Sequence, residues 1–212
     1  MIIKKTKNEK KIKLMGITGK MGSGKSLFSS FFKKKGIPVY FSDQRGKILM
    51  NQVEIIKKNV IKYFGVNSYN QNKINKFYLS KIVFKNPTAL KLLCSIVHPW
   101  ISVDFQQWIM RKIHIKNISY VIKESAILFE SGSYKECDWV TTIISSKENM
   151  IERIMKRDNL NENQITDRLK NQIYNEKREK KSNFIVENYL SKYHLQKKAN
   201  EIHKKLLKII QK

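Results

Sequence analysis

Residues 19–26, with the sequence Gly-Lys-Met-Gly-Ser-Gly-Lys-Ser, decide the fold of this 212-residue chain. They fit the pattern of a glycine, four spacers and Gly-Lys-Ser, which is typical of a loop that holds the phosphates of a nucleoside triphosphate. The apolar run 14–17 before this phosphate loop predicts a buried parallel strand, and residues 27–32 after it predict a helix. Glycines let the backbone N–H groups and the positive helix end point at phosphate oxygens. The motif predicts triphosphate binding and leaves the phosphate acceptor open.

The same segment supplies the expected nucleotide contacts. Lys25 is expected to reach the terminal phosphates, and Ser26 is expected to hold Mg²⁺. The residues expected to bind the triphosphate are Gly22, Ser23, Gly24, Lys25 and Ser26, together with Leu27, which directly follows the segment.

Patterning along the rest of the chain predicts an α/β fold with a mostly parallel five-stranded sheet. The helix after the phosphate loop is expected to stop at Gly36, a usual C-terminal signal. Residues 44–116 have a mostly helical pattern, which His98-Pro99 is expected to interrupt because proline bars helix continuation. The other four strands are expected at 37–41, 120–122, 139–144 and 184–186. A C-terminal helix is expected to present an apolar face made of Ile202, Leu206, Ile209 and Ile210.

The chain is strongly basic, with 43 Lys and Arg against 17 Asp and Glu and a net charge of +26. Such a charge ordinarily suggests nucleic acid as a partner. Here the lysines are scattered and accompany many Asn and Ile residues, as an AT-rich coding sequence would produce, and no recognition-helix or zinc-finger pattern accompanies them. Residues 1–13 look like a basic, frayed extension. We expect no specific nucleic-acid partner, and the oligomeric state stays open.

Neither membrane insertion nor export is expected. No stretch is apolar for long enough to span a bilayer. Cys94 and Cys137 lie far apart, without the spacing of a zinc site or a disulfide framework. The expected location is the cytoplasm.

Polar residues after strand ends are the first candidates for chemistry, because ligands of open parallel sheets bind beyond the carboxyl ends of the strands. Asp43 follows the second strand and is placed to accept the proton of an attacking hydroxyl, although aspartate is also a favoured helix N-cap. Glu124 and Glu130 follow the strand at 120–122, and spacing does not decide between substrate binding and helix capping. His98 alone fits a packing residue as well as a ligand.

Three cations in the polar segment 147–181 form a further candidate. Arg153, Lys156 and Arg157 are spaced to share one face of a helix, where they would surround a triphosphate. In a chain this basic, a solvated helix face explains the same spacing.

Taken together, these landmarks resemble the dephospho-coenzyme A kinase family, whose members phosphorylate the ribose 3′-hydroxyl of dephospho-CoA with ATP. The His98-Pro99 pair and the 128–132 segment, Leu-Phe-Glu-Ser-Gly, are more specific than the phosphate loop, which many nucleotide kinases share. The matching segments also include Gly36-Ile37-Pro38-Val39 before Asp43, Ile82-Val83-Phe84 before Asn86-Pro87, Arg153 with Arg157-Asp158, Arg168 with Asn171-Gln172, and Glu187-Asn188.

The resemblance implies a three-layer P-loop core with a helical acceptor-binding insertion and a helical lid, all within one kinase domain. The core would comprise residues 13–45, 117–146 and 182–212, the insertion 46–116 and the lid 147–181. The implied catalytic residues are Asp43 as base, with Lys25 and Arg157 stabilising the transferred group, and Arg153 would bind nucleotide. The residues implied to border the acceptor are Asp43, His98, Leu128 and Glu130.

The chain departs from the family pattern at a few positions. Lys20 stands where glycine is typical, and Leu27 replaces a hydroxyl residue but keeps its backbone N–H. Phe41-Ser42-Asp43 replaces a stretch that commonly carries two aspartates, which puts a second acid beside Asp43 in doubt. A nucleoside or nucleoside-monophosphate kinase, or a basic nucleic-acid-binding protein that uses ATP as a switch, remain alternatives.

Overall fold

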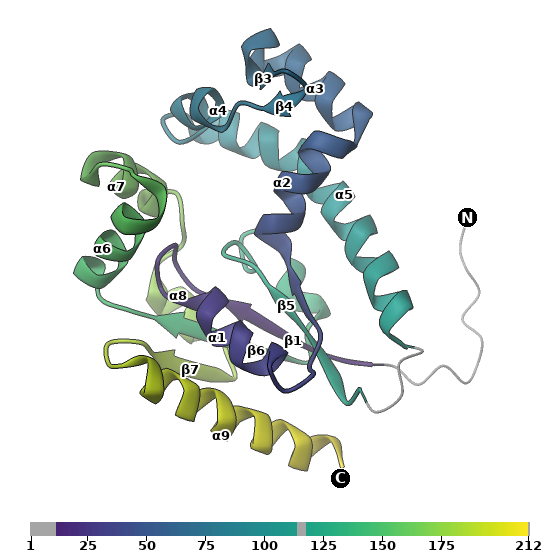
Figure 1. The fold of residues 1–212 in the computed structure, drawn as a ribbon, viewed down its shortest axis with the longest axis vertical. Coiled ribbons are helices and arrows are strands. Elements are labelled where there is room, and N and C mark those ends of the chain that lie inside the picture. Colours follow the sequence, from purple (N-terminus) through teal and green to yellow (C-terminus); the bar gives the residue numbers. More distant parts are fainter. Residues whose placement is uncertain (1–11, 114–117, 212) are drawn as a thin grey trace.

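A computed structural model describes residues 12–113 and 118–211, and its centre is a five-stranded sheet with every strand pair parallel. The strand order is β2-β5-β1-β6-β7 (Figure 1), which confirms the predicted α/β sheet. Every residue of β1 after Lys13 is buried, as expected of a parallel strand covered on both faces. The strands are β1 (Lys13–Thr18), β2 (Val39–Phe41), β5 (Tyr120–Glu124), β6 (Trp139–Ile144) and β7 (Phe184–Glu187).

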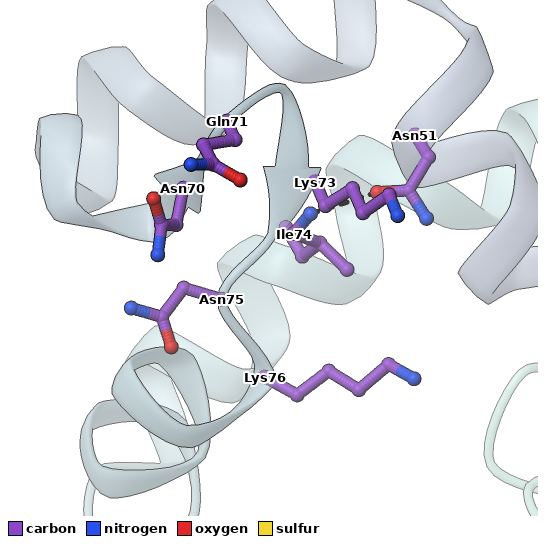
Figure 2. A pocket seen from close by; sticks show the side chains of 7 residues that line it. All are labelled: Asn51, Asn70, Gln71, Lys73, Ile74, Asn75 and Lys76. Carbon is purple, nitrogen blue, oxygen red and sulfur yellow. Dashed lines mark hydrogen bonds between the residues drawn. The ribbon is translucent and has the colours of Figure 1, made fainter.

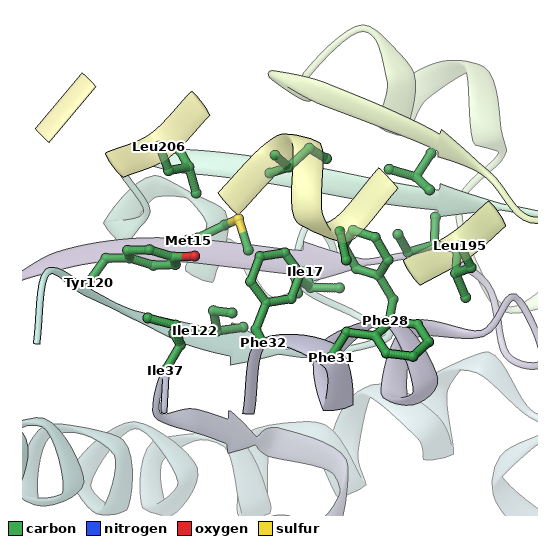
Figure 3. Packing of buried hydrophobic residues seen from close by; sticks show 14 residues of the cluster. Met15, Ile17, Phe28, Phe31, Phe32, Ile37, Tyr120, Ile122, Leu195 and Leu206 are labelled. Atoms are coloured by element: carbon green, nitrogen blue, oxygen red, sulfur yellow. The ribbon is translucent and has the colours of Figure 1, made fainter. Parts of the chain in front are cut away.

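Helices cover both faces of this sheet and make the predicted three layers. On one face, Phe28 and Phe32 of α1 (Lys25–Lys33) and Leu195 of α9 (Lys192–Ile210) pack against Met15 and Ile17 of β1 (Figure 3). On the other face, Leu14 and Val121 pack with Phe105 of α5 (Pro87–Ile113). Successive strand residues point to opposite faces, so the same short apolar runs supply both cores.

The predicted apolar face of the C-terminal helix is confirmed only in part. Ile202 and Leu206 are buried in the main core, and Ile210 packs at its edge, but Ile209 is 42% exposed. Most of the basic extension predicted for residues 1–13 lies outside the described residues, and Lys13 already belongs to β1.

The segment between β2 and β5 forms a helical body with a hydrophobic cluster of its own, built around Ile56, Val60 and Leu79. A two-stranded hairpin within it was not predicted; its turn residues Gln71 and Asn72 both have positive φ, as tight hairpin turns require. The elements are α2 (Ser42–Gln52), α3 (Glu54–Phe64), the 3-10 turn Val66–Ser68, β3 (Tyr69–Asn70), β4 (Lys73–Ile74), α4 (Lys76–Val83) and α5.

The prediction that the helix ends at His98-Pro99 is wrong. Helix α5 runs through Pro99, although proline has no N–H to donate to the preceding turn. Val97 packs into the cluster of the insertion, and Phe105 packs into the core of the sheet. Tertiary packing on both sides of Pro99 therefore offsets the missing hydrogen bond.

Three helices follow β6: the first two stand beside the sheet, toward the helical body, and the third lies against the sheet (Figure 1). They are α6 (Lys147–Asp158), α7 (Glu162–Lys170) and α8 (Asn175–Glu179). Ile154, Ile165 and Leu169 form a small cluster with Met21 of the phosphate loop. None of the helices in the described part of the chain has the length and apolar character that crossing a membrane requires.

Asp104 of α5 ties the helical body to the sheet. Its carboxylate accepts hydrogen bonds from the hydroxyl of Tyr40 in β2, at 2.6 Å, and from Nε and Nη2 of Arg45 in α2, at 2.9 and 2.6 Å. The Arg45 hydrogen bonds hold the pKa of Asp104 below its usual value.

We expect Asp104→Asn to lower the free energy of unfolding by about 2–3 kcal/mol, because it removes a charge-assisted pair and leaves Arg45 without its counter-charge. The folded-state pKa of Asp104 is depressed, so its contribution is full above the unfolded pKa and is lost as pH falls through the folded pKa. Urea unfolding at pH 7 and pH 3 measures both effects. Asp167→Asn is the control substitution. Equal stability of the wild type and Asp104→Asn at pH 7 would contradict this role of Asp104.

Candidate active site

The phosphate loop connects β1 to α1 at the carboxyl edge of the sheet. Gly22 has φ 80° and Gly24 has φ 100°, a region that favours glycine. A side chain at Gly22 would meet the Met150 carbonyl at 2.7 Å, and one at Gly24 would meet Asn188 at 2.2 Å. Lys20 does not have positive φ, so the backbone there tolerates a side chain.

The N-terminus of α1 presents the expected backbone donors. Gly24 is its N-cap residue, and the first intrahelical hydrogen bond runs from Phe28 N to the Gly24 carbonyl at 3.0 Å. The amides of Lys25, Ser26 and Leu27 precede that bond, so they lie at the positive end of the helix. Ser23 is fully buried at the base of the loop.

Three segments distant in sequence hold the phosphate loop in place. The Gln172 side chain accepts from Met21 N at 2.9 Å, and Asn188 Nδ2 donates to the Ser23 carbonyl at 2.8 Å. Arg153 donates to the Gly22 carbonyl at 3.3 Å. The loop is therefore preorganised by residues that lie between 131 and 165 positions further along the chain.

Lys25 and Glu124 form the buried centre of the site. Lys25 is 6% exposed, and its Nζ donates to the Lys20 carbonyl at 3.1 Å. Burial lowers the pKa of Lys25, while Glu124 and Asp43 oppose that shift. Burial raises the pKa of Glu124 to about 7 against the opposing charge of Lys25. Each group lies in the field of the other.

Asp43 lies in the first turn of α2, directly after β2, and is exposed. The N-cap of this helix is Phe41, so Asp43 is not the capping residue that its type also allowed. The charge of Asp43 acts on Lys25, Glu124 and Arg157. The structure therefore brings the predicted base into one electrostatic cluster with the phosphate-loop lysine.

The predicted acceptor residues fall into two groups. His98 is partly buried and lies in the field of Asp43; burial lowers its pKa. Leu128, by contrast, is fully buried and packs with Phe129 and Val140, so a direct substrate contact of its side chain is not supported by the structure. Glu130 accepts from Arg178 at 2.7 Å and from Ile173 N at 3.2 Å, and it thus already has protein partners.

The three cations predicted to share one helix face, Arg153, Lys156 and Arg157, have different partners. Arg153 donates to Gly22, Ser145 and Asn188 and so holds the loop, whereas Lys156 pairs with Glu152 and is 76% exposed. Arg157 forms two hydrogen bonds to Asp158, at 2.9 and 2.8 Å. Of these cations, Arg157 is the one whose charge acts on both Lys25 and Glu124.

Arg178 is a site residue that the sequence did not reveal. Its side chain is fully buried and donates to Thr18 Oγ1 at 2.8 Å, to the Ala126 carbonyl at 3.1 Å and to Glu130 at 2.7 Å. It thereby joins α8, the end of β1 and the turn after β5. In a chain with 43 cationic residues, one arginine in a polar segment carries no signal of such a role.

A surface hollow of about 450 Å³ lies elsewhere, at the β3–β4 hairpin (Figure 2). Its lining is polar, and the Asn51 side chain accepts from Ile74 N at 2.7 Å there. None of its lining residues belongs to the phosphate loop or to the cluster around Lys25. We therefore assign the candidate site to the side chains at the carboxyl edge of the sheet and not to this hollow.

Comparisons with known proteins agree over most of the chain. A family model described as dephospho-CoA kinase matches residues 13–192. A Bacteroides fragilis protein named dephospho-CoA kinase is 32% identical over 174 residues, which are 82% of this chain and 83% of the relative. The structure of dephospho-CoA kinase from Campylobacter jejuni is 28% identical with a TM-score of 0.63, and the match covers 91% of this chain and 96% of that one. A Thermus thermophilus crystal structure, 24% identical, has the same fold with a TM-score of 0.76 over 93% of this chain and 99% of its own.

Proposed function

The chain belongs to the dephospho-CoA kinase family, and we propose that it transfers the γ-phosphoryl group of ATP to the ribose 3′-hydroxyl of dephospho-CoA by means of Asp43, Lys25 and Arg157. The observation that carries the assignment of these residues is their convergence. Two carboxylates, Asp43 and Glu124, and two cations, Lys25 and Arg157, act on one another at the mouth of the phosphate loop.

Asp43 is the proposed base. Its carboxylate accepts the proton of the 3′-hydroxyl as the hydroxyl oxygen bonds to the γ-phosphorus, and the bond from that phosphorus to the β,γ-bridging oxygen breaks to release ADP. Asp43 is exposed at the end of β2, so an acceptor can approach it from the side of the helical insertion.

Lys25 and Arg157 are the proposed stabilising cations. Phosphoryl transfer needs charge stabilisation rather than covalent catalysis by the protein, and a buried ammonium stabilises more than a hydrated one. Lys25 is preorganised for this because its Nζ is already held at the loop by the Lys20 carbonyl. Arg157 would leave Asp158 and turn its guanidinium to the migrating group.

Mg²⁺ is the proposed metal cofactor, with Ser26 as its ligand from the protein. The hydroxyl of Ser26 lies in the first turn of α1, 3.3 Å from a carboxylate oxygen of Glu124. These are the hard oxygen atoms that Mg²⁺ prefers. When bound, the ion neutralises charge on the β- and γ-phosphates.

Residues 46–116 are proposed as the acceptor-binding insertion and residues 147–181 as the lid. The two already touch: Arg168 of α7 lies over the ring of Phe84 at 4.9 Å, and Asn171 donates to the Phe84 carbonyl at 3.1 Å. Closure here would exclude water from the reacting phosphate and limit ATP hydrolysis. Because Arg178 anchors α8 to the sheet and Arg153 ties α6 to the phosphate loop, the moving part of the lid would be α7.

The test is acceptor selection. ADP release is measured with ATP and Mg²⁺ in the presence of dephospho-CoA, adenosine or AMP. We expect turnover with dephospho-CoA and little with the other two acceptors. Turnover with adenosine or AMP alone would reassign the chain to nucleoside or nucleoside-monophosphate phosphorylation.

A further inference from the structure

The phosphate loop carries a second lysine, Lys20, whose ammonium has no part in the mechanism proposed above. Its backbone carbonyl accepts hydrogen bonds from Ser23 N and from Nζ of Lys25, each at 3.1 Å. A lysine in the position of Lys25 reaches the β- and γ-phosphates of a bound nucleotide. These hydrogen bonds therefore place Lys20 at the terminal-phosphate end of the loop.

Within the described part of the chain, the Lys20 ammonium donates no hydrogen bond and forms no ion pair. It lies over the ring of Tyr174, with 5.6 Å between Nζ and the ring centroid. This distance is near the limit of about 6 Å for a cation–π interaction, and the ring is 69% exposed, so the contact is weak. Burial lowers the pKa of Lys20, and Arg178 adds to that shift while Glu176 opposes it. An ammonium that is partly desolvated and has three free donors favours an anionic partner.

The turn that carries Tyr174 lies where the phosphate loop, the lid and the helical insertion meet. Two residues of this turn make the connections: Gln172 accepts from Met21 N at 2.9 Å, and Asn171 donates to the Phe84 carbonyl at 3.1 Å. In the proposed reaction, the γ-phosphate of ATP and the diphosphate of dephospho-CoA both approach this region. The Lys20 ammonium is thus close to the expected paths of two phosphate-bearing substrates.

The neighbouring cation, Arg178, is not available for the same task. Its guanidinium donates to Thr18, to the Ala126 carbonyl and to Glu130, and it is fully buried. We infer that Lys20 is a phosphate-binding residue, whose ammonium leaves the Tyr174 ring and donates to a phosphate oxygen when the substrates are bound. The phosphate belongs to the γ-position of ATP or to the diphosphate of the acceptor, which share the same chemistry. This inference rests on the proposed phosphoryl transfer and adds a binding residue to it.

The experiment has one arm for each source of phosphate. Calorimetry gives the affinities for Mg²⁺-ATP and Mg²⁺-ADP without acceptor, and steady-state kinetics gives the KM for dephospho-CoA. Lys20→Met keeps the backbone carbonyl that holds Lys25, so its effect reports on the ammonium. We expect a loss of about tenfold, typical of one charge-assisted hydrogen bond. Weaker ATP binding with unchanged ADP binding would identify the γ-phosphate, and a raised KM with both nucleotide affinities unchanged would identify the acceptor diphosphate.

Two further variants control this measurement. Lys180→Met removes an exposed lysine next to α8 and should change each quantity by no more than about twofold, because salt screens exposed charges. Tyr174→Leu removes the ring but keeps the ammonium, so it should leave substrate binding equal or tighter. If Tyr174→Leu reproduced the loss seen in Lys20→Met, Lys20 would only hold the lid turn, and the inference would be overturned.

Two other results would also overturn it. One is unchanged ATP affinity together with an unchanged KM for dephospho-CoA in folded Lys20→Met, and the other is an equal loss of ATP and ADP affinity, which indicates a distorted loop. Lys20→Gln replaces Lys20→Met if the latter does not fold. A wild type that binds no Mg²⁺-ATP would contradict the proposed function itself, whereas failure of dephospho-CoA as acceptor would leave the nucleotide arm standing.

Discussion

Asp43→Asn is expected to lower kcat by about 10³-fold, within the range that general base catalysis contributes, while ATP affinity changes by no more than about twofold. Asparagine keeps the size of the side chain but cannot accept the proton of the 3′-hydroxyl. Asp43 is exposed and is not the N-cap of α2, so the fold should persist. The measurements are steady-state kinetics with dephospho-CoA, ATP affinity by calorimetry, and thermal unfolding.

The control for this variant is Glu54→Gln. Glu54 is an exposed acid in the first turn of the neighbouring helix α3, so its loss costs a similar small interaction with the helix dipole. It should leave kcat within about twofold of the wild type. Turnover of Asp43→Asn close to the wild-type rate would remove Asp43 as the base.

Lys25→Met is expected to weaken ATP binding and to lower kcat by about 10²–10³-fold, the loss typical for one preorganised electrostatic donor. Methionine fills a similar volume without the charge that Lys25 brings to the terminal phosphates. The ammonium is buried and held by the Lys20 carbonyl, so no exposed lysine of this basic chain can take its place without rearrangement. Calorimetry and single-turnover kinetics separate the two effects.

Lys33→Met is the matched control, because Lys33 is the last residue of the same helix and is exposed. The substitution removes one of the 43 cationic side chains of the protein, from the same helix as Lys25. It should leave ATP affinity and kcat unchanged. Equal losses in the two variants would mean that the general positive charge, rather than Lys25, attracts the nucleotide.

The sequence predicted those parts of the fold that depend on local pattern. The strand before the phosphate loop, the loop itself and the helix after it follow from apolar runs and glycine spacing within residues 14–32. Pro99 shows the limit of such reasoning, because local preference ends a helix there and packing on both sides continues it. The β3–β4 hairpin was missed because each of its strands has only two residues.

The site was predictable where one motif or one strand end places a residue, as with Lys25, Ser26 and Asp43. It was not predictable where the contact joins distant segments. Glu124 lies 98 positions from Ser26, and Arg178 lies 160 positions from Thr18, so only the tertiary fold brings each pair together. Sequence spacing alone placed Glu124 after a strand and did not decide between substrate binding and helix capping, and it gave no sign of the contact with the phosphate-loop serine.

The central claim is phosphoryl transfer from ATP to the 3′-hydroxyl of dephospho-CoA, and identification of the product tests it most directly. The protein is incubated with ATP, Mg²⁺ and dephospho-CoA, and the product is analysed by mass spectrometry and ³¹P NMR. The account predicts one added phosphate, present as a monoester on the ribose 3′-oxygen, together with an equal amount of ADP. ADP without a phosphorylated acceptor, or a phosphate at another position, would contradict it.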